Sequence, residues 1–213
     1  MTQNDSVAWE LLPKEAQEYL AQHKTIKKYQ RGQFIYHMNE QPQGLYLVED
    51  GLIGIIIYSS SGAEHLLRLY KKGQYFGHRS LFAEELYHAG SICLQDCTIS
   101  MIPKNIVNDI FQNFPQTQMM VIRYLAQDLG RAERQRVSIS EKEVQSRIAE
   151  SLIYLLTLHP EYNWTRKEIA SFCGTTTATT IKALAQLEDQ GLIQQSGRKI
   201  QILRRQDLEK LTH

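Results

Sequence analysis

The stretch from Trp164 to Leu203 constrains the fold of this chain more than any other. Thr165 and Glu168 have the S/T-x-x-E spacing of a capping box, which starts a helix, and Gly174 can adopt the left-handed conformation that ends one. A second helical pattern covers residues 176–189, and two short β-type runs follow it. This order of helix, turn, helix and two-stranded wing predicts a winged helix-turn-helix unit, whose second helix typically lies in the major groove of DNA.

The second helix of this unit has two distinct faces. One face repeats at the spacing of a buried core, and its residues are Thr180, Ala183, Leu184 and Leu187. The opposite face is expected to meet base edges, and its residues are Thr177, Ala178, Ile181, Lys182 and Ala185. A solvated surface is the alternative for each outward residue taken alone, but the ordered string of motifs favours a DNA-reading face.

The residue types on and around the outward face suit contacts with DNA. Thr177 can hydrogen-bond a base edge or offer its methyl group to thymine, and Lys182 can reach guanine or a phosphate. Ala178 and Ile181 are apolar, which suits contact with a thymine methyl group. Phosphate contacts are predicted from the two helix starts and the tip of the wing, and the residues are Arg166, Thr175, Thr176, Arg198 and Lys199.

The overall charge gives no bulk attraction to nucleic acid. The 213 residues include 24 Lys and Arg against 23 Asp and Glu, a net charge of +1, so DNA contacts must come from local patches. Three scattered cysteines do not make a disulfide framework. The sequence shows no signal pattern and no apolar run of membrane-spanning length, which favours a cytoplasmic protein with reduced cysteines.

The residues before the winged helix have a different texture. A short amphipathic helix is predicted from Trp9 to Gln22, with Pro13 in its first turn. Between Ile26 and Met101, short β-rich runs alternate with turns, which predicts an antiparallel barrel or sandwich. Asp50-Gly51 is typical of a hairpin, because this dipeptide tolerates the positive φ angles of a tight turn.

Residues from Pro115 to Val137 predict one long helix. Apolar residues on one face follow the 3-4 spacing of a coiled-coil seam, and they are Ile122, Leu125, Leu129 and Ala132. A second face, with Val121, Tyr124 and Asp128, is expected to pack on the barrel. The seam favours a homodimer, and the alternative is one amphipathic helix that covers a single core without a partner.

A hinge is predicted at residues 137–140, where the seam ends. Ser140 and Glu143 have capping-box spacing, which predicts the start of a new helix. The expected fold class is α+β with three parts. Residues 1–114 form an antiparallel β-barrel of jelly-roll type with its N-terminal helix, residues 115–138 form the long dimerisation helix and hinge, and residues 139–213 form the winged helix-turn-helix.

Together these patterns resemble the CRP/FNR family of bacterial transcription regulators. The string TRKEIASFCGTTTATTIKALAQLEDQGLI carries the most specific part of the resemblance. GLYLVEDGLIGI and KKGQYFGHRSLFAEELYHAG resemble parts of the family's cyclic-nucleotide-binding barrel. The resemblance covers nearly all of the chain and implies a homodimer whose central helices transmit an effector signal to paired winged helices. Each winged helix would read half of a roughly palindromic operator.

The reading helix departs from the cyclic-AMP-responsive branch of that family. The family's base-reading positions match Thr177, Ala178 and Lys182 of this chain, and that branch usually has Arg and Glu at the first two. Ala178 cannot accept a hydrogen bond from cytosine as Glu does. The resemblance therefore implies a different operator, in which Lys182 is the main polar reader and thymines matter more.

The effector cassette departs further from that branch. The family holds the cyclic nucleotide with a Gly-Glu and an Arg-Ser pair; here Gly77 is kept, His78 replaces the Glu, and His88 and Ala89 replace the Arg and Ser. The candidate pocket residues are Gly77, His78, Arg79, Ser80, His88 and Ala89, with Ala132 and Glu133 at the positions that usually contact adenine. A largely neutral His binds phosphate weakly, so cyclic AMP is not expected to be the effector.

Neither a cofactor nor an enzymatic role is indicated. Glu84 and Glu85 near His78 and His88 leave a metal site on a cupin-like barrel as an alternative to a substituted nucleotide cassette. No cysteine precedes Cys93, so the iron–sulfur cluster of the oxygen-sensing branch is not expected, and no residue argues for haem. The sequence has no Ser/His/Asp order, phosphate-binding loop or paired-carboxylate pattern that points to an enzyme.

The sequence thus predicts a sequence-specific DNA-binding transcription regulator, with no metal or cofactor and no catalytic role. Its expected partners are double-stranded DNA, a second copy of the chain and RNA polymerase. An unidentified small-molecule effector is a further possible partner, and no association with a membrane is expected. The alternative is a ligand-binding or protein-interaction module whose winged helix contacts protein and not DNA.

Overall fold

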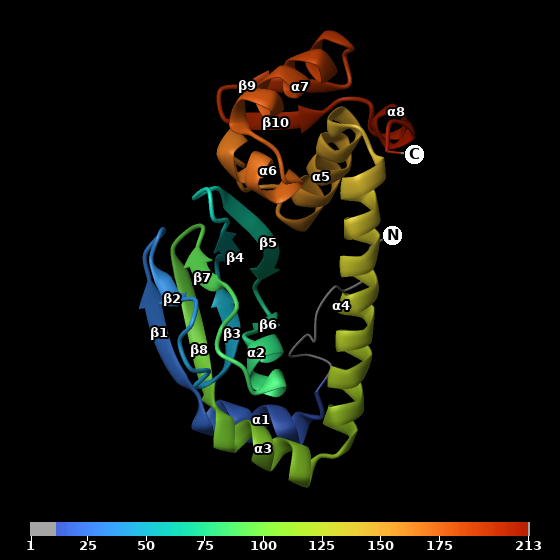
Figure 1. Cartoon of the computed structure of the whole chain (residues 1–213). Coiled ribbons are helices and arrows are strands. Elements are labelled where there is room, and N and C mark those ends of the chain that lie inside the picture. Colours follow the sequence, from blue (N-terminus) through green and yellow to red (C-terminus); the bar gives the residue numbers. More distant parts are fainter. Residues whose placement is uncertain (1–11, 213) are drawn as a thin grey trace. The chain divides into compact units, whose positions relative to one another are not determined.

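The computed structural model describes residues 12–212 of the chain, which divide into two compact units (Figure 1). The first unit holds the residues up to Gly62 and Leu67–Arg131, and the second holds the short segment Ala63–Leu66 and the residues from Ala132 onward. Within the described residues, no helix combines the length and the apolar character that crossing a membrane would need.

Two four-stranded sheets form the β-barrel of the first unit, as the alternating β-rich runs predicted. The first sheet has the order β1-β8-β3-β6, with strands Thr25–Tyr29, Cys97–Pro103, Gly44–Asp50 and Tyr75–Phe76. The second has the order β2-β7-β4-β5, with strands Phe34–Tyr36, Gly90–Cys93, Leu52–Tyr58 and Glu64–Lys71. The central strands β8 and β7 pair antiparallel with both of their neighbours. Side chains such as Val48, Ile53, Phe76 and Ile99 are buried between the sheets.

Asp50-Gly51 is not the hairpin turn that the sequence predicted. Strands β3 and β4 belong to different sheets, so this dipeptide carries the chain from one sheet to the other. Gly51 does have a positive φ of 106°. A Cβ at this position would lie 2.5 Å from Sγ of Cys97 and 2.8 Å from the backbone oxygen of Asp96. The glycine is therefore required both by its φ angle and by the close approach of the chain that enters β8.

Helices cover one end of the barrel (Figure 1). They are α1 (Lys14–His23), α3 (Lys104–Asn113) and the first turns of α4 (Gln116–Glu141), while the short α2 (His78–Ala83) follows β6. Apolar residues of α1 and α3 pack with residues of the barrel in one buried cluster that includes Leu20, Ile102 and Ile110. Helix α1 begins after Pro13, later than predicted; the predicted start at Trp9 lies outside the described residues.

The long helix α4 continues through the segment that was predicted to be a hinge. It ends at Glu141, and α5 (Val144–Leu158) begins after Glu143, whose side chain makes no capping hydrogen bond. The hydroxyl of Ser140 donates to the backbone oxygen of Val137 at 2.9 Å. The predicted capping box of Ser140 and Glu143 is therefore wrong, because the serine bonds back to the preceding turn of a continuing helix.

The second unit contains the winged helix-turn-helix. After α5 come α6 (Arg166–Cys173), α7 (Thr177–Asp189), the wing strands β9 (Ile193–Ser196) and β10 (Lys199–Ile202), and α8 (Arg205–Lys210). The two wing strands pair antiparallel, with Ser196 opposite Lys199 at the tip. The core of the unit consists of fully buried residues from three helices, and they include Ile148, Leu152, Leu155, Ile169, Leu184 and Leu187.

Candidate nucleic-acid interface and effector cavity

Local caps fix the two helices of the motif. The side chain of Thr165 accepts a hydrogen bond from the backbone N–H of Glu168 at 3.1 Å, and the carboxylate of Glu168 accepts one from the backbone N–H of Thr165 at 2.8 Å. This confirms the predicted capping box. Gly174 ends α6 with a φ of 67°. Thr176 caps α7 by accepting the backbone N–H of Thr179 at 3.1 Å.

Helix α7 has the two faces that its periodicity predicted. The core-spaced residues Thr180, Ala183, Leu184 and Leu187 are all buried. The outward residues Thr177, Ala178, Ile181, Lys182 and Ala185 are all exposed. Ile181 is 54% exposed within its own chain, although it is a large apolar residue. This face therefore offers apolar groups and one lysine to a partner outside the unit.

The wing is tied to the start of α6. The guanidinium of Arg166 donates to the backbone oxygen of Arg198 at 3.1 Å and to Oε1 of Gln195 at 2.5 Å. Glu188 of α7 accepts from the backbone N–H of Gln195 at 2.6 Å and from its side-chain amide at 2.9 Å. Arg166 therefore positions the wing, while Arg198 and Lys199 are exposed at its tip.

Sequence reasoning missed the roles of Gln195 and Glu188. Their partners lie on different elements of the motif, so no local spacing pointed to them. Thr175 is half-buried at the turn, and its backbone N–H donates to the oxygen of Ala170 at 3.0 Å. Thr176 and Thr177 remain exposed at the start of α7. The N-terminal end of α7 is thus open to an anionic partner such as a phosphate.

A cavity of about 320 Å³, including the part that opens to solvent, lies in the barrel at the position of the predicted effector cassette. It brings together five of the predicted pocket residues, which are Gly77, His78, Arg79, Ser80 and His88. Arg68, Tyr70, Tyr36 and Tyr87 also line it and were not predicted. Arg68 and Tyr70 lie two residues apart on β5, so the period-two spacing of a strand could have revealed an inward arginine.

Both histidines of the cavity are poor phosphate ligands. Burial lowers the pKa of His78 to about 4. Burial also lowers the pKa of His88, and the nearby Arg79 lowers it further. Both imidazoles are therefore neutral at pH 7 and bring no positive charge to the site.

The two arginines of the cavity already have carboxylate partners. Arg68 forms an ion pair with Asp128 of α4. Arg79 lies 3.1 Å, Nη1 to Oε2, from Glu85. Each permanent cation is thus paired within the unit, and a phosphate would have to compete with a carboxylate for either of them.

The remaining predicted pocket residues, Ala89, Ala132 and Glu133, are not part of this cavity lining. Ala89 is 1% exposed and belongs to the barrel core. Ala132 and Glu133 lie on α4 beyond the part of the helix that belongs to the first unit. Among residues 12–212, no group of three or more His, Cys, Asp or Glu is arranged to hold a metal ion. The three cysteines are buried and form no disulfide.

The face of α4 that was predicted to pack on the barrel does so. Tyr124 is buried, Asp128 pairs with Arg68, and Val121 lines a second cavity. On the predicted seam, Ile122 is 55% and Leu129 61% exposed within the chain. The helix therefore presents an uncovered apolar face beside the face that contacts the barrel.

Two family descriptions match the two parts of the chain. Residues 26–114 match the cyclic nucleotide-binding domain, and residues 146–211 match the Crp-like helix-turn-helix domain. The first match covers the barrel and α3, and the second covers most of α5 and the whole winged helix-turn-helix motif. Helix α4 lies between the two matches.

Curated relatives agree with these matches. The cAMP-activated global transcriptional regulator CRP of Pasteurella multocida (strain Pm70) is 29% identical over 192 residues, which cover 86% of this chain and 92% of the relative. An uncharacterised protein of Haemophilus influenzae (strain Rd) is 32% identical over 111 residues, which cover 52% of this chain and 83% of that protein.

Solved structures share the fold. FixK2 from Bradyrhizobium japonicum superposes with a TM-score of 0.79 at 22% identity, over 89% of this chain and 98% of that one. A CRP/FNR family transcriptional regulator from Thermus thermophilus gives a TM-score of 0.72 at 24% identity, over 88% and 98% of the two chains. The order of barrel, long helix and winged helix-turn-helix, the matched domains and these relatives agree, and the chain belongs to the CRP/FNR family of DNA-binding transcription regulators.

Proposed function

We propose that this regulator is a homodimer that reads a palindromic operator through its two α7 helices. The observation that carries the proposal is the exposed outward face of α7, held on a fully capped helix-turn-helix. Lys182 is the polar reader of a guanine or a phosphate, while Thr177, Ala178 and Ile181 meet thymine methyl groups. The exposed cations at the wing tip and the threonines at the start of α7 bind the phosphate backbone.

The dimer part of the proposal rests on helix α4. Ile122 and Leu129 lie seven residues apart and are both more than half exposed, which is the spacing of a coiled-coil seam. A second α4 helix packed on this seam would remove both side chains from water. A two-fold dimer presents its two reading helices with the same symmetry as a palindromic operator. RNA polymerase and a small-molecule effector are the further partners expected of such a regulator.

We further propose that cyclic AMP is not the effector. The relative from Pasteurella multocida is cAMP-activated, but the cassette of this chain has two neutral histidines and two arginines that are already paired. The phosphate of a cyclic nucleotide carries a full negative charge, and burying it without an unpaired cation is costly. The effector, where there is one, is expected to carry less negative charge than a cyclic nucleotide.

A binding assay on operator DNA tests the groove assignment. Lys182→Ala should weaken binding by about 1–3 kcal/mol, or roughly five- to 150-fold, if Lys182 reads a base. The matched control is Lys210→Ala, which removes the same charge from α8 of the same unit. Equal binding by wild type and Lys182→Ala would show that α7 does not read the groove in this way.

The second candidate function is a protein-interaction module. The apolar outward face of α7, with Ile181 at 54% exposure, is the observation that favours it. Arg166→Ala separates the two, because it releases the wing from α6 and should weaken DNA binding through loss of wing position. A protein partner held on α7 alone would not respond to that change.

We also propose that the protein acts in the cytoplasm, because its proposed function is to bind DNA.

A further inference from the structure

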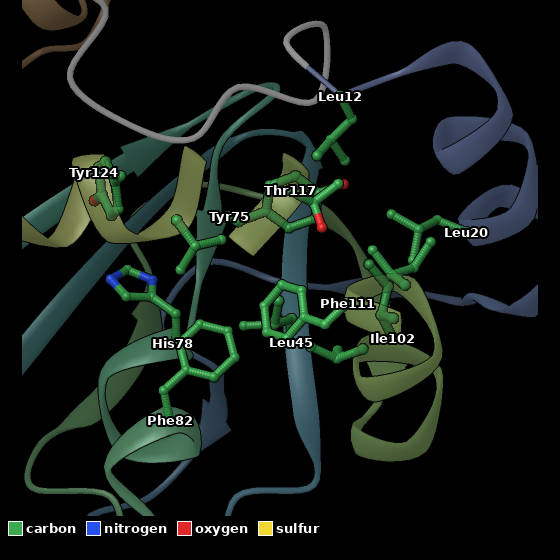
Figure 2. Close-up of a pocket in the computed structure, with 13 residues that line it drawn as sticks. Leu12, Leu20, Leu45, Tyr75, His78, Phe82, Ile102, Phe111, Thr117 and Tyr124 are labelled. Atoms are coloured by element: carbon green, nitrogen blue, oxygen red, sulfur yellow. The ribbon is translucent and has the colours of Figure 1, made fainter. Parts of the chain in front are cut away.

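A second cavity of the first unit also has His78 in its lining (Figure 2). Its volume is about 550 Å³, including the part that opens to solvent. It lies among α1, α2, α3, the start of α4 and strands of the first sheet. His78 lines both cavities, so its side chain forms part of the wall between them.

The lining of this cavity is almost entirely hydrocarbon. Figure 2 shows Phe82 and Phe111 toward its middle, and His78 and Tyr124 on the opposite side from Leu20 and Ile102. Thr117 also lines it, and its hydroxyl donates to the backbone oxygen of Phe114 at 2.7 Å. Apolar walls with few polar groups are typical of sites that bind small molecules.

His78 brings a ring nitrogen to this lining. The residue is 5% exposed, and Nε2 is a buried atom without a hydrogen-bond partner among the described residues. The ring packs edge-on against Tyr124, with centroids 5.2 Å apart. Buried polar atoms of this kind are nearly always hydrogen-bonded, and leaving one unsatisfied destabilises the fold. Nε2 of His78 is therefore an unsatisfied polar atom on a residue that lines both cavities.

We propose that this cavity binds a small, uncharged, mostly apolar molecule with one hydroxyl group. The hydrocarbon part would lie against Leu20, Phe82 and Phe111, and the hydroxyl would bond to Nε2 of His78. A hydroxyl fits because it can either donate or accept and so suits both tautomers of the imidazole. A carboxylate does not fit, because it would lose its hydration without gaining a positively charged partner in the cavity.

The site has a direct structural link to the long helix. Thr117, Val121 and Tyr124 of α4 all line the cavity, so a bound molecule would contact the helix that carries the exposed seam. Binding in this cavity does not depend on the proposed function, because it concerns only the first unit and is measured without DNA.

Titration calorimetry and amide NMR on the full-length protein test the site with simple probes. Hexanol and octanol are expected to bind saturably at one site per chain and to shift the amide signals of α2 and the start of α4. Chlorohexane, which has the same chain without the hydroxyl, is expected to bind several-fold more weakly than hexanol. Hexanoate at pH 7 is expected not to bind. Equal affinity for hexanol and chlorohexane, or no saturable binding of either, would overturn the proposal.

Two variants locate the site. Val121→Trp fills the cavity and should weaken octanol binding at least about tenfold, whereas the control Gln127→Trp places the same side chain on an exposed part of α4 and should not. His78→Phe should remove the preference for hexanol over chlorohexane while leaving an apolar site. A preference that survives His78→Phe would contradict the assigned anchor, and this comparison remains decisive if the cavity-filling variant does not fold.

Discussion

The guanidinium of Arg68 in β5 forms an ion pair with the carboxylate of Asp128 in α4. The Asp128 side chain is 14% exposed, and its Oδ1 also lies 3.3 Å from Nη2 of Arg131. The pair joins the second barrel sheet to the long helix at the wall of the cassette cavity. Because both charges are largely withdrawn from water, loss of either partner leaves a poorly compensated charge behind.

The coupling between Arg68 and Asp128 is therefore expected to exceed that of a surface pair. A double-mutant cycle of Arg68→Ala and Asp128→Ala should give a coupling energy of about 1–2 kcal/mol in urea unfolding. This coupling energy is lower than for a fully buried pair, because Asp128 keeps its contact with Arg131 when Arg68 is removed. The pair Arg205 and Glu209, which is about half exposed on α8 with a separation of 2.9 Å, is the control and should give about 0.3–0.5 kcal/mol. Equal values for the two pairs would contradict this account.

The stability of the barrel should fall as pH decreases below 6.5. The pKa of His78 is about 4 because the ring is buried, so between pH 6.5 and 4 the unfolded chain takes up a proton that the folded chain does not. The free energy of unfolding is expected to drop by about 3 kcal/mol across this window from His78 alone, and this part of the loss is complete below pH 4. Denaturant unfolding at a series of pH values measures it.

His78→Phe should flatten this pH dependence whatever its effect on stability at pH 7. His88, whose pKa is also lowered, acts in the same direction, so His88→Gln should remove a smaller part of the slope. Asp128 and Arg68 are the charged groups that act on the His78 ring, in opposite directions. An unchanged slope in His78→Phe would show that the imidazole is not held neutral by burial.

The winged helix was predictable from sequence because its determinants are local. The capping box of Thr165 and Glu168, the turn at Gly174 and the buried spacing of Leu184 and Leu187 each depend on residues within a few positions. These local signals all point to the same structure, which is the condition for a reliable prediction.

The barrel was predictable only in class. The hairpin predicted at Asp50-Gly51 is wrong. The dipeptide indicates a turn, but the choice of a strand's partner depends on sequence-distant residues such as Cys97, which lies against Gly51. The pairing of Arg68 with Asp128 spans 60 residues and has no local signal. The hydroxyl of Ser140 has two possible partners, the backbone oxygen of Val137, to which it donates, and the backbone N–H of Glu143, from which a capping serine would accept. The continuation of α4 decides between them.

Charges placed on the seam of α4 should dissociate the proposed dimer. The double variant Ile122→Glu, Leu129→Glu would put four carboxylates into one interface and is expected to weaken dimerisation at least about a hundredfold, because each apolar side chain contributes roughly 1.5–3 kcal/mol when buried. Sedimentation equilibrium measures the change. Gln127→Glu, on the exposed face away from the seam, should leave the dimer intact. A monomeric wild type, or a dimer unaffected by the double variant, would rule out this seam.

Thymine methyl groups should contribute measurably to operator binding. Replacing thymine by uracil at a contacted position removes one methyl group from the apolar face of α7, and a buried group of this size contributes about 0.8 kcal/mol. Affinity should therefore fall about fourfold per contacted base. The loss of affinity on replacing thymine by uracil should be smaller in Ile181→Ala, because this change removes most of the apolar side chain that contacts the methyl group. Equal affinity for the two DNAs would show that the methyl groups are not read.

The central claim is that paired winged helices read a specific DNA sequence. Selection of bound duplexes from a random DNA pool by the purified protein tests it most directly. The expected result is an enriched palindrome with two half-sites about one helical turn apart. The half-sites are expected to be rich in thymine and to contain a guanine that the wild type requires and that Lys182→Ala does not. No enriched sequence, or a single half-site without a symmetry-related partner, would contradict it.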